Sequence, residues 1–344
     1  MKASVLHGQR DLRNEVLPTP EPRPDEVLIR VRRAGICGSD MHYFLHGRVG
    51  SFVPRHPFVM GHEFAGEVAA AGAPADAGLV GQRVVVDPSM PCGHCGYCRG
   101  GRYNLCINMR FYGSASVDPH INGGFAEFVV APAANCHTLP AGLTWGAAAM
   151  SEPLSVTIHA AMRAGNLAGR SILVIGGGTI GQLTALTARA FGARIVAVSD
   201  LAAFPRDLAV ELGADAALDP ADPEIAAAAA KLSPDGFDVV FEASGAPPAV
   251  GAAIALARRG GTIVQIGTLA SDVTAPLNAI MARELSYLGS FRFANVFGTA
   301  LDLIATGRVQ VEPLINAVYS LDDMAAAMQR AVGKDGVIKV QIEP

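Results

Sequence analysis

The sequence predicts a two-domain α/β protein: a β-rich domain formed by both ends of the chain, and a doubly wound parallel sheet between them. From Met1 to about Pro153, short apolar or alternating runs such as EVLIRVRRAGI and GQRVVVDP stop at Gly or Pro. From about Leu154, strand-like runs alternate with amphipathic helical runs, and the closing segments return to the first domain. We therefore expect one discontinuous domain over 1–153 and 294–344, and the parallel sheet over 154–293.

Length and composition limit the class of protein. A chain of 344 residues with 50% hydrophobic residues can bury two cores. The net charge of −4 and the lack of a basic run disfavour nucleic acid and anionic membrane partners. No apolar run approaches the roughly 20 residues that span a bilayer, and MKASVLHGQRDLRNEV lacks the apolar part of a secretory signal. We expect a cytoplasmic globular protein.

The cysteines indicate metal ligation, because an intracellular compartment keeps thiols reduced. The segment PCGHCGYCRGGRYNLC holds Cys92, Cys95, Cys98 and Cys106, separated by two, two and seven residues. Four thiolates at this spacing can enclose one tetrahedral ion and leave no open position. An iron–sulfur cluster is the alternative, but its motif places the fourth Cys sooner and before a Pro, whereas Ile107 follows here. The spacing favours structural zinc.

A second set of metal donors is mixed in chemistry. Cys37, His62 and Glu63 offer the S, N and O donors of a catalytic zinc that keeps one position open. Cys37 and His62 lie 25 residues apart, so only a folded domain could bring them together. Neighbouring side chains of a regular strand point to opposite faces, so His62 and Glu63 reach one metal only at a local irregularity. Glu152, in the S-E-P-L segment, is the competing carboxylate.

A glycine-rich turn predicts a dinucleotide site. The strand-like run SILVI at 171–175 is followed by G-G-G-T-I-G and by a helical run to about residue 191. Glycines here permit a tight turn and a close approach of the pyrophosphate to the helix N-terminus. The residues expected at the pyrophosphate are Gly176, Gly178, Thr179, Ile180 and Gly181.

The next strand-like run, RIVAVSD, ends at Asp200, which can accept hydrogen bonds from both ribose hydroxyls of NAD and would repel the extra phosphate of NADP. Arg206 could tolerate that phosphate, so use of NADP as well stays open. FDVVFEASG, GGTIVQIGT and ELSYLGSF complete the predicted sheet. We expect the loops at Ser244, Gly267 and Phe291 to line the nicotinamide end.

Together these motifs resemble one known superfamily. Cys37 opens C-G-S-D-M-H, and His62 and Glu63 lie in G-H-E-x-x-G, ahead of the four-cysteine and dinucleotide motifs. Over essentially its whole length the chain resembles the zinc-dependent medium-chain dehydrogenases, which include alcohol and polyol dehydrogenases. The resemblance implies a chaperonin-10-like (GroES-like) barrel for the first domain, a Rossmann fold for the second, two zinc ions per chain, and a homo-oligomer, either a tetramer or a dimer.

The resemblance also implies a mechanism, in which zinc stabilises the substrate hydroxyl oxygen as an alkoxide and hydride passes to the nicotinamide. Ser39 and His42, three residues apart on one helical face, would relay the proton, although Ser39 could instead be a helix N-cap. Asp40 would orient the His62 ring. In polyol dehydrogenases the G-H-E carboxylate is a ligand and the E-P-L carboxylate holds the zinc water or substrate. On that basis Glu63 is the third ligand and Glu152 the second carboxylate.

Residues 108–125 and 288–293 resemble the L-idonate 5-dehydrogenase branch, relatives of sorbitol dehydrogenase. An aldonate needs a cation for its carboxylate, which Arg110 or Arg292 could supply unless either forms a surface or subunit salt bridge; Arg55 and His56 are further candidates. Tyr43 is expected to be a substrate hydroxyl partner or an aromatic wall.

The expected reaction is NAD-linked oxidation of L-idonate to 5-keto-D-gluconate, and the alternative is an L-iditol or sorbitol 2-dehydrogenase that acts on a neutral polyol. A zinc-free quinone reductase of the same fold is disfavoured by Cys37, His62 and the four-cysteine segment. A zinc-ribbon interaction protein is disfavoured by the acidic net charge and by the cofactor motif.

Overall fold

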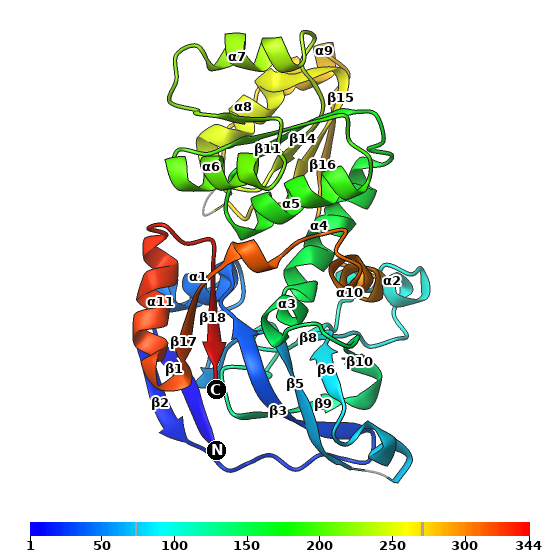
Figure 1. Ribbon diagram of the computed structural model, residues 1–344, viewed down its shortest axis with the longest axis vertical. Coiled ribbons are helices and arrows are strands. Elements are labelled where there is room, and N and C mark those ends of the chain that lie inside the picture. Colours follow the sequence, from blue (N-terminus) through cyan, green and yellow to red (C-terminus); the bar gives the residue numbers. More distant parts are fainter. Residues whose placement is uncertain (73, 270–271) are drawn as a thin grey trace. The chain divides into compact units, whose positions relative to one another are not determined.

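The computed structural model describes residues 1–72, 74–269 and 272–344. The chain divides into two compact units (Figure 1). Unit 1 comprises Met1–Glu152, Phe297–Gly307 and Val311–Pro344, and unit 2 comprises Pro153–Val296 and Arg308–Gln310. The boundaries expected from the sequence fell after residues 153 and 293. The predicted α/β fold class is confirmed, because unit 1 is built on antiparallel and mixed sheets and unit 2 on a parallel one.

The main sheet of unit 1 has the order β10-β6-β5-β3-β18-β17, with β9 also pairing with β3. The C-terminal strand β18 pairs antiparallel with β3, which is why the last segment of the chain belongs to this unit. Along β3, Val27, Ile29 and Val31 are buried while Arg30 is exposed, as a strand with one face on the core requires. The strands of this sheet are β3 (Glu26–Gly35), β5 (Glu63–Ala71), β6 (Arg83–Val86), β9 (Phe128–Pro132), β10 (Cys136–Thr138), β17 (Ile315–Ser320) and β18 (Lys339–Glu343).

Smaller sheets and short helices complete unit 1. A second sheet has the order β2-β1-β4, and β7 pairs with β8. These strands are β1 (Lys2–Gly8), β2 (Asp11–Val16), β4 (Phe58–Val59), β7 (Ser89–Met90) and β8 (Arg110–Phe111). The helices are α1 (Gly38–His46), α2 (Gly96–Arg99), α3 (Trp145–Ala149), α10 (Phe297–Ala305) and α11 (Met324–Gly333), with 3₁₀ turns η1 (Pro74–Leu79), η2 (Tyr103–Leu105), η3 (Ala133–Asn135), η4 (Glu312–Leu314) and η5 (Leu321–Asp323).

Unit 2 contains a parallel sheet of order β13-β12-β11-β14-β15-β16, so the direction of winding reverses between β11 and β14. In such sheets ligands bind beyond the carboxyl ends of the strands at this reversal. The strands are β11 (Ser171–Ile175), β12 (Ile195–Ser199), β13 (Ala216–Leu218), β14 (Phe237–Glu242), β15 (Ala257–Gln265) and β16 (Ser286–Gly289). The helices are α4 (Ser151–Ala164), whose first two residues belong to unit 1, and α5 (Thr179–Ala190), α6 (Ala203–Glu211), α7 (Ile225–Leu232), α8 (Pro247–Leu256) and α9 (Leu277–Ala282).

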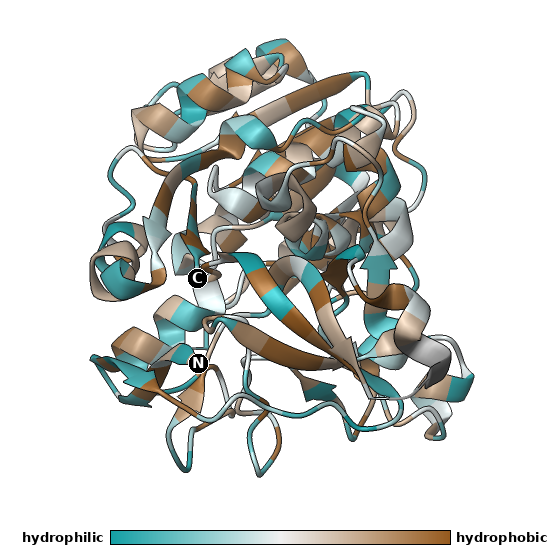
Figure 2. Cartoon of the chain, turned by 60° about the horizontal axis from the view of Figure 1, so that its bottom comes forward, coloured by the Kyte–Doolittle hydropathy of each residue, from teal (hydrophilic) through white to brown (hydrophobic). Residues whose placement is uncertain are grey.

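Helices cover both faces of the unit 2 sheet. Ile172 and Val174 of β11 pack with alanines of α4, α5 and α6, whereas Leu173 and Ile175 pack in a cluster with residues of α7 and α8. All residues of SILVI are buried, as the uninterrupted apolar run predicted. Figure 2 shows apolar residues concentrated on the strands.

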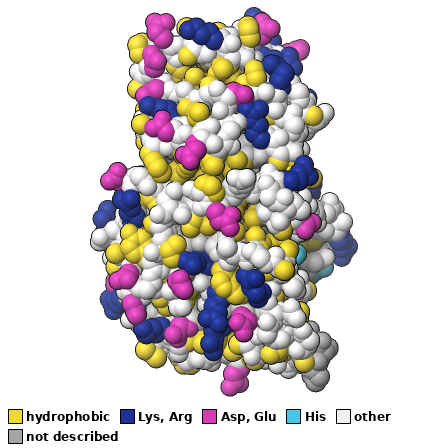
Figure 3. Space-filling view, viewed as in Figure 1, with side chains coloured by type: hydrophobic (Ala, Val, Ile, Leu, Met, Phe, Trp, Pro, Cys, Tyr) yellow, Lys and Arg dark blue, Asp and Glu magenta, His cyan; other side chains and the backbone are white. Residues whose placement is uncertain are grey.

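The surface agrees with the low net charge. On the face drawn in Figure 3, basic and acidic side chains are interspersed. Among the described residues, no helix combines the length and hydropathy needed to cross a bilayer.

Candidate metal centres and cofactor site

Helix α1 begins at Gly38, and Cys37, with an extended backbone (φ −99°, ψ 162°), is its N-cap. The Asp40 carboxylate accepts a hydrogen bond of 2.8 Å from the Cys37 amide, as the third residue of a capping box does. The amide of Ser39 lies against the Cys37 thiol. The alternative that Ser39 is the N-cap is therefore wrong, because Cys37 occupies that position.

The irregularity required beside His62 is present. Gly61 has φ +91°, and a Cβ there would lie 2.7 Å from the Phe125 ring. His62 lies just before β5 and Glu63 opens it, so the two side chains do not follow strict strand alternation. Asp40 Oδ1 accepts from the Gly61 amide at 3.4 Å and lies 4.0 Å from His62 Nδ1. Asp40 thus holds the backbone of both ligand segments, and it is too far from the ring for a hydrogen bond.

Three donor atoms converge in unit 1. One ligand atom each from Cys37, His62 and Glu63 lies within 4.8 Å of the others. Among the described residues, the buried Oε1 of Glu63 has no hydrogen-bond partner, which is unusual for a carboxylate unless a cation completes the site. Burial, then the Glu63 charge, raises the pKa of Cys37 to about 12. A coordinating metal deprotonates such a thiol, so this donor set fits zinc.

A buried cation lies beside these donors. Lys339 Nζ forms an ion pair with Glu63 Oε2 and donates to the carbonyl of Ile36 at 3.0 Å. Burial lowers the pKa of Lys339, but the charges of Glu63 and Cys37 outweigh it and raise the pKa above the usual value. Gly35 faces Glu63 across the sheet, and a Cβ at Gly35 would lie 2.0 Å from Glu63 Oε2. The sequence reasoning missed Lys339; a lysine in the buried run KVQI was the available signal.

Glu152 belongs to the same buried cluster. Its side chain is 5% exposed, and burial raises its pKa to about 8, with His62 opposing and Glu63 adding to the rise. Its carboxylate is not one of the three converging donors. The geometry therefore favours Glu63 over Glu152 as the third ligand.

The proposed proton relay residues lie on α1. Ser39 and His42 are both half-buried, and the His42 ring lies 5.5 Å from that of His46. Burial, then the His46 charge, lowers the pKa of His42, so its imidazole is neutral at physiological pH.

The structure changes the role predicted for Tyr43. Its side chain is only 2% exposed, its ring packs edge-on against Phe58, and its hydroxyl accepts the amide of Ala115 at 3.0 Å. A side chain buried to this extent is part of the core, and its hydroxyl is engaged by the Ala115 amide, which contradicts the prediction of a substrate hydroxyl partner. The alternative of an aromatic wall stays a prediction.

The structure also argues against Arg110 as the cation for the substrate carboxylate. Arg110 and Phe111 are neighbours on β8 and point to opposite sides. The Phe111 ring lies 5.6 Å from that of His62, whereas Arg110 lines a cavity of about 840 Å³ together with Met90 and Tyr112. The strand therefore brings Phe111, which the sequence reasoning overlooked, to the donors instead of Arg110.

The other cationic candidates in unit 1 are paired. Arg55 Nη1 lies 3.1 Å and His56 Nε2 3.2 Å from carboxylate oxygens of Asp118.

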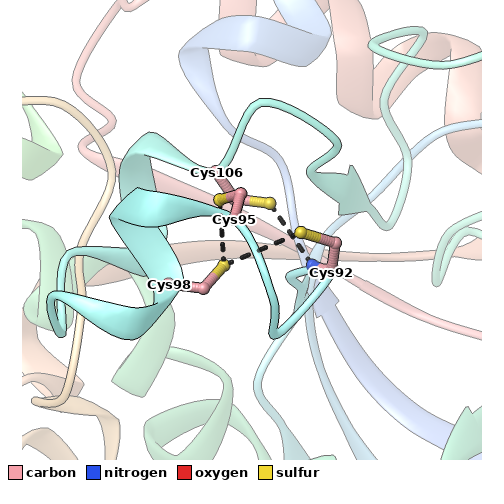
Figure 4. A group of neighbouring side chains, drawn as sticks. All are labelled: Cys92, Cys95, Cys98 and Cys106. Carbon is pink, nitrogen blue, oxygen red and sulfur yellow. Dashed lines mark hydrogen bonds between the residues drawn. The ribbon is translucent and has the colours of Figure 1, made fainter.

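The four cysteines of the second motif point toward one another (Figure 4). Their sulfurs lie within 4.8 Å of each other, with 3.5 Å between Cys95 and Cys98 and 4.0 Å between Cys92 and Cys98. Tetrahedral zinc with Zn–S bonds of about 2.3 Å needs sulfurs about 3.8 Å apart. The amide of Cys98 first, and that of Ile107 after it, helps lower the pKa of Cys95 to about 6. This arrangement of free cysteines fits a closed structural zinc site.

The glycine-rich turn of unit 2 has the form that the motif predicted. Gly176 has φ +99°, Gly178 is the N-cap of α5, and a Cβ at Gly181 would lie 1.7 Å from the Gly176 carbonyl. Thr179 and Ile180 form the first turn of the helix. Backbone amides at a helix start are suited to a pyrophosphate.

Asp200 and Arg206 are both held in place. The Asp200 carboxylate accepts the amides of Gly177 at 2.7 Å and Ala202 at 2.8 Å. Arg206 donates to the Asp200 carbonyl at 2.7 Å and pairs with Asp219 at 3.0 Å. The guanidinium is therefore engaged with acceptors of the protein itself.

The remaining candidates of unit 2 lie beyond the sheet's carboxyl edge. Ser244 and Gly267 follow β14 and β15. Phe291 is 50% exposed, and the Arg292 guanidinium lies 5.0 Å from the centre of its ring, where Arg292 has φ +52°.

Comparison with known proteins agrees with this geometry. Residues 23–141 match the alcohol dehydrogenase GroES-like domain, and residues 179–306 match the zinc-binding dehydrogenase domain. A sorbitol dehydrogenase of Bacillus subtilis is 38% identical over 100% of this chain and 97% of its own length. The chain therefore belongs to the zinc-binding alcohol dehydrogenase family.

Two further dehydrogenases are similar over most or all of this chain. L-idonate 5-dehydrogenase (NAD(P)(+)) of Escherichia coli is 36% identical over 92% of this chain and 91% of its own length. Its crystal structure superposes with a TM-score of 0.91, covering 100% of this chain and 98% of that one at 34% identity. A Sinorhizobium meliloti zinc-binding dehydrogenase, solved with NADP, gives a TM-score of 0.90 at 37% identity, covering 100% and 99%. The protein is a zinc-dependent oxidoreductase of the polyol or sugar alcohol dehydrogenase class, and the cofactor prediction of zinc and a nicotinamide dinucleotide agrees with that assignment.

Proposed function

We propose that this dehydrogenase oxidises a secondary alcohol of a sugar acid, with L-idonate as substrate and 5-keto-D-gluconate as product. The observation that carries the proposal is the convergence of Cys37, His62 and Glu63, with one carboxylate oxygen of Glu63 unpartnered among the described residues. The acid specificity is supported by the relative named L-idonate 5-dehydrogenase, and half-buried Arg292, whose guanidinium lies 5.0 Å from the centre of the Phe291 ring, is the proposed partner of the substrate carboxylate. Because the sorbitol dehydrogenase is about equally similar, a neutral polyol such as sorbitol or L-iditol is the alternative substrate.

Cys37, His62 and Glu63 would hold the catalytic zinc, and Cys92, Cys95, Cys98 and Cys106 the structural one. When bound, the catalytic ion supplies Lewis acidity toward the substrate oxygen. Glu152, which is buried in the same cluster, would be the carboxylate that exchanges a proton with the substrate or the zinc-bound water. Ser39 and His42 would carry the released proton along α1 toward solvent, since both are half-buried on one face.

NAD is the proposed cofactor. Asp200 presents a carboxylate at the end of β12, and Arg206 is paired with Asp219, so little cationic character is left for a 2′-phosphate. The relative bound to NADP keeps dual use as the alternative. A dimer or tetramer is proposed as well, and light scattering of the purified protein tests it.

One substrate panel tests the proposal. Zinc-loaded enzyme is assayed with L-idonate, sorbitol and L-iditol, and with NAD and NADP, and L-idonate is expected to have the highest kcat/KM. Arg292→Ala should lower kcat/KM for L-idonate at least tenfold more than for sorbitol, because only the acid carries a carboxylate for the guanidinium. Arg259→Ala, an exposed arginine of β15, is the matched control. Equal losses on both substrates would remove the carboxylate role of Arg292.

A further inference from the structure

A buried carboxylate lies under the loops of unit 2 that are expected to receive the nicotinamide. Glu242 is the last residue of β14, and its side chain is 0% exposed. Its backbone pairs with Ile175 of β11 on one side and Gln265 of β15 on the other. Glu242 therefore stands at the carboxyl edge of three adjacent strands, next to the reversal point of the sheet.

The Glu242 carboxylate accepts hydrogen bonds from the loop after β14 and from the last residue of β15. In the loop after β14, the amide of Ser244 donates at 2.8 Å, that of Gly245 at 3.0 Å, and the Ser244 hydroxyl donates as well. From β15, the side-chain amide of Gln265 donates at 2.5 Å. All these groups donate, and no ion pair reaches Glu242 within the described part of the chain. An acceptor-only carboxylate is the group that such a set of donors requires.

Gln265 extends this network to the next strand. Its Nε2 also donates to the carbonyl of Gly267 at 2.7 Å, and its Oε1 accepts the hydroxyl of Tyr287 on β16 at 2.6 Å. The Tyr287 hydroxyl thereby selects the orientation of the Gln265 amide. If that amide turned over, its oxygen would face the Glu242 carboxylate.

The loops above Glu242 are packed at backbone contact. A Cβ at Gly267 would lie 2.2 Å from the Gly245 amide nitrogen and 2.7 Å from Glu242 Oε2. A Cβ at Gly245 would lie 2.4 Å from the carbonyl of Thr268, and one at Gly176 would lie 2.8 Å from the Ser244 amide nitrogen. The turns after β11, β14 and β15 thus approach at backbone contact, and a carboxylate oxygen of Glu242 lies beside the contact between Gly245 and Gly267.

We propose that Glu242 is a positioning residue for the nicotinamide half of the cofactor: it holds the loops 243–246 and 266–269 at the spacing that this half requires. The inference rests on the proposed function, because it takes those loops to be the nicotinamide end. The adenosine half is bound elsewhere, by the Gly176–Gly181 turn and Asp200. Glu242 should therefore affect the two halves of the dinucleotide unequally.

The test measures the binding of NADH and of ADP-ribose, which lacks the nicotinamide, to the zinc-loaded protein by isothermal titration calorimetry. In Glu242→Gln one acceptor oxygen becomes an NH₂ donor, which must face either the side-chain amide of Gln265 or the backbone amides of Ser244 and Gly245. Two donors then oppose each other, so the loops separate. We expect the Kd for NADH to rise about tenfold and the Kd for ADP-ribose to change less than twofold. Glu224→Gln, on the exposed start of α7, is the control with the same change of charge and should leave both constants unchanged.

The outcomes are distinguishable. If folded Glu242→Gln binds NADH as wild type does, or loses affinity for both ligands equally, the positioning role is overturned. If wild type binds neither ligand, the proposed function fails instead. Should Glu242→Gln not fold, Tyr287→Phe replaces it: freeing the Gln265 amide should raise the Kd for NADH about threefold without changing that for ADP-ribose. Two unchanged constants in Tyr287→Phe would equally overturn the inference.

Discussion

The ammonium of Lys339 and the carboxylate of Glu63 form an ion pair that is almost wholly shielded from solvent, with side chains 2% and 1% exposed. Lys339 engages one oxygen of Glu63 and leaves the other without a partner among the described residues. The pair thus prevents a buried carboxylate from standing alone beside a thiol, in the same cluster where a Glu63 oxygen converges with the Cys37 and His62 donors. Gly35 makes the pairing possible, because any side chain there would occupy the same space.

Replacing Lys339 tests this relationship. Lys339→Met leaves Glu63 buried without its cation, so the free energy of unfolding of the metal-free protein should fall by about 3–5 kcal/mol. The zinc-loaded protein should lose less, because the metal supplies positive charge in its place. Denaturant unfolding of both forms measures the difference, with exposed Lys231→Met as control. Equal losses with and without zinc would show that the pair does not serve the metal donors.

Cysteine substitutions should separate the two metal sites. Cys37→Ser should fold, retain one zinc ion per chain, and lose at least a hundredfold in kcat, since the catalytic ion is lost while the second site is intact. Cys92→Ser should lose the other ion and with it thermal stability, because a closed four-thiolate site contributes to folding. Metal analysis and thermal unfolding of both variants are the measurements. A Cys92→Ser protein as stable as wild type would remove the structural role.

Tyr43→Phe tests the reassignment of Tyr43 to the core. The buried amide of Ala115 would lose its acceptor, which should cost about 1–2 kcal/mol of unfolding free energy. Since the hydroxyl faces the protein interior, KM for the sugar substrate should change less than twofold. A tenfold rise in KM with unchanged stability would restore the substrate contact.

Asp87 should make stability depend on pH. This carboxyl follows β6 and accepts the amide of Ser89 at 2.9 Å, and burial raises its pKa to about 6. The folded state therefore binds a proton more tightly than the unfolded state, whose Asp pKa is about 3.9, and stability falls as pH rises from about 4 to 6. Above pH 6 the folded protein bears the full free-energy cost of burying the ionised Asp87 carboxylate.

Asp87→Asn removes that cost and keeps an oxygen for the Ser89 amide. The variant should exceed wild type by about 2–3 kcal/mol in unfolding free energy at pH 8, and by about half as much at pH 5. Urea unfolding at the two pH values measures this. A stabilisation independent of pH would assign the effect to something other than titration of Asp87.

Most of the architecture was predictable from short stretches of the sequence. The dinucleotide turn depends on consecutive residues, since Gly176, Gly178 and Gly181 are needed where the chain turns from β11 into α5, and these were identified from their spacing. The four-cysteine site is equally local, because a compact loop brings its thiols together. Strand alternation likewise identified the buried face of β3.

The polar partners at the candidate site were not predictable in this way. Lys339 lies 276 positions after Glu63 in the sequence, and no pattern in either segment predicts that the two side chains pair. Arg110 was chosen for its charge, but a single step along β8 turns Phe111 toward His62 instead. Tyr43 lies on the expected helix, yet its hydroxyl is directed by Ala115 from a distant loop.

The sequence by itself determined the α/β class, the two metal motifs and the dinucleotide turn, because each follows from short-range spacing and hydrophobic period. Only the tertiary structure decided which carboxylate converges with Cys37 and His62, which cation compensates it, and which side chains become core. These depend on pairing between segments far apart in the chain and on the cost of burying a charge without a partner. Neither the pairing of distant segments nor this free-energy cost can be predicted from a single stretch of the sequence.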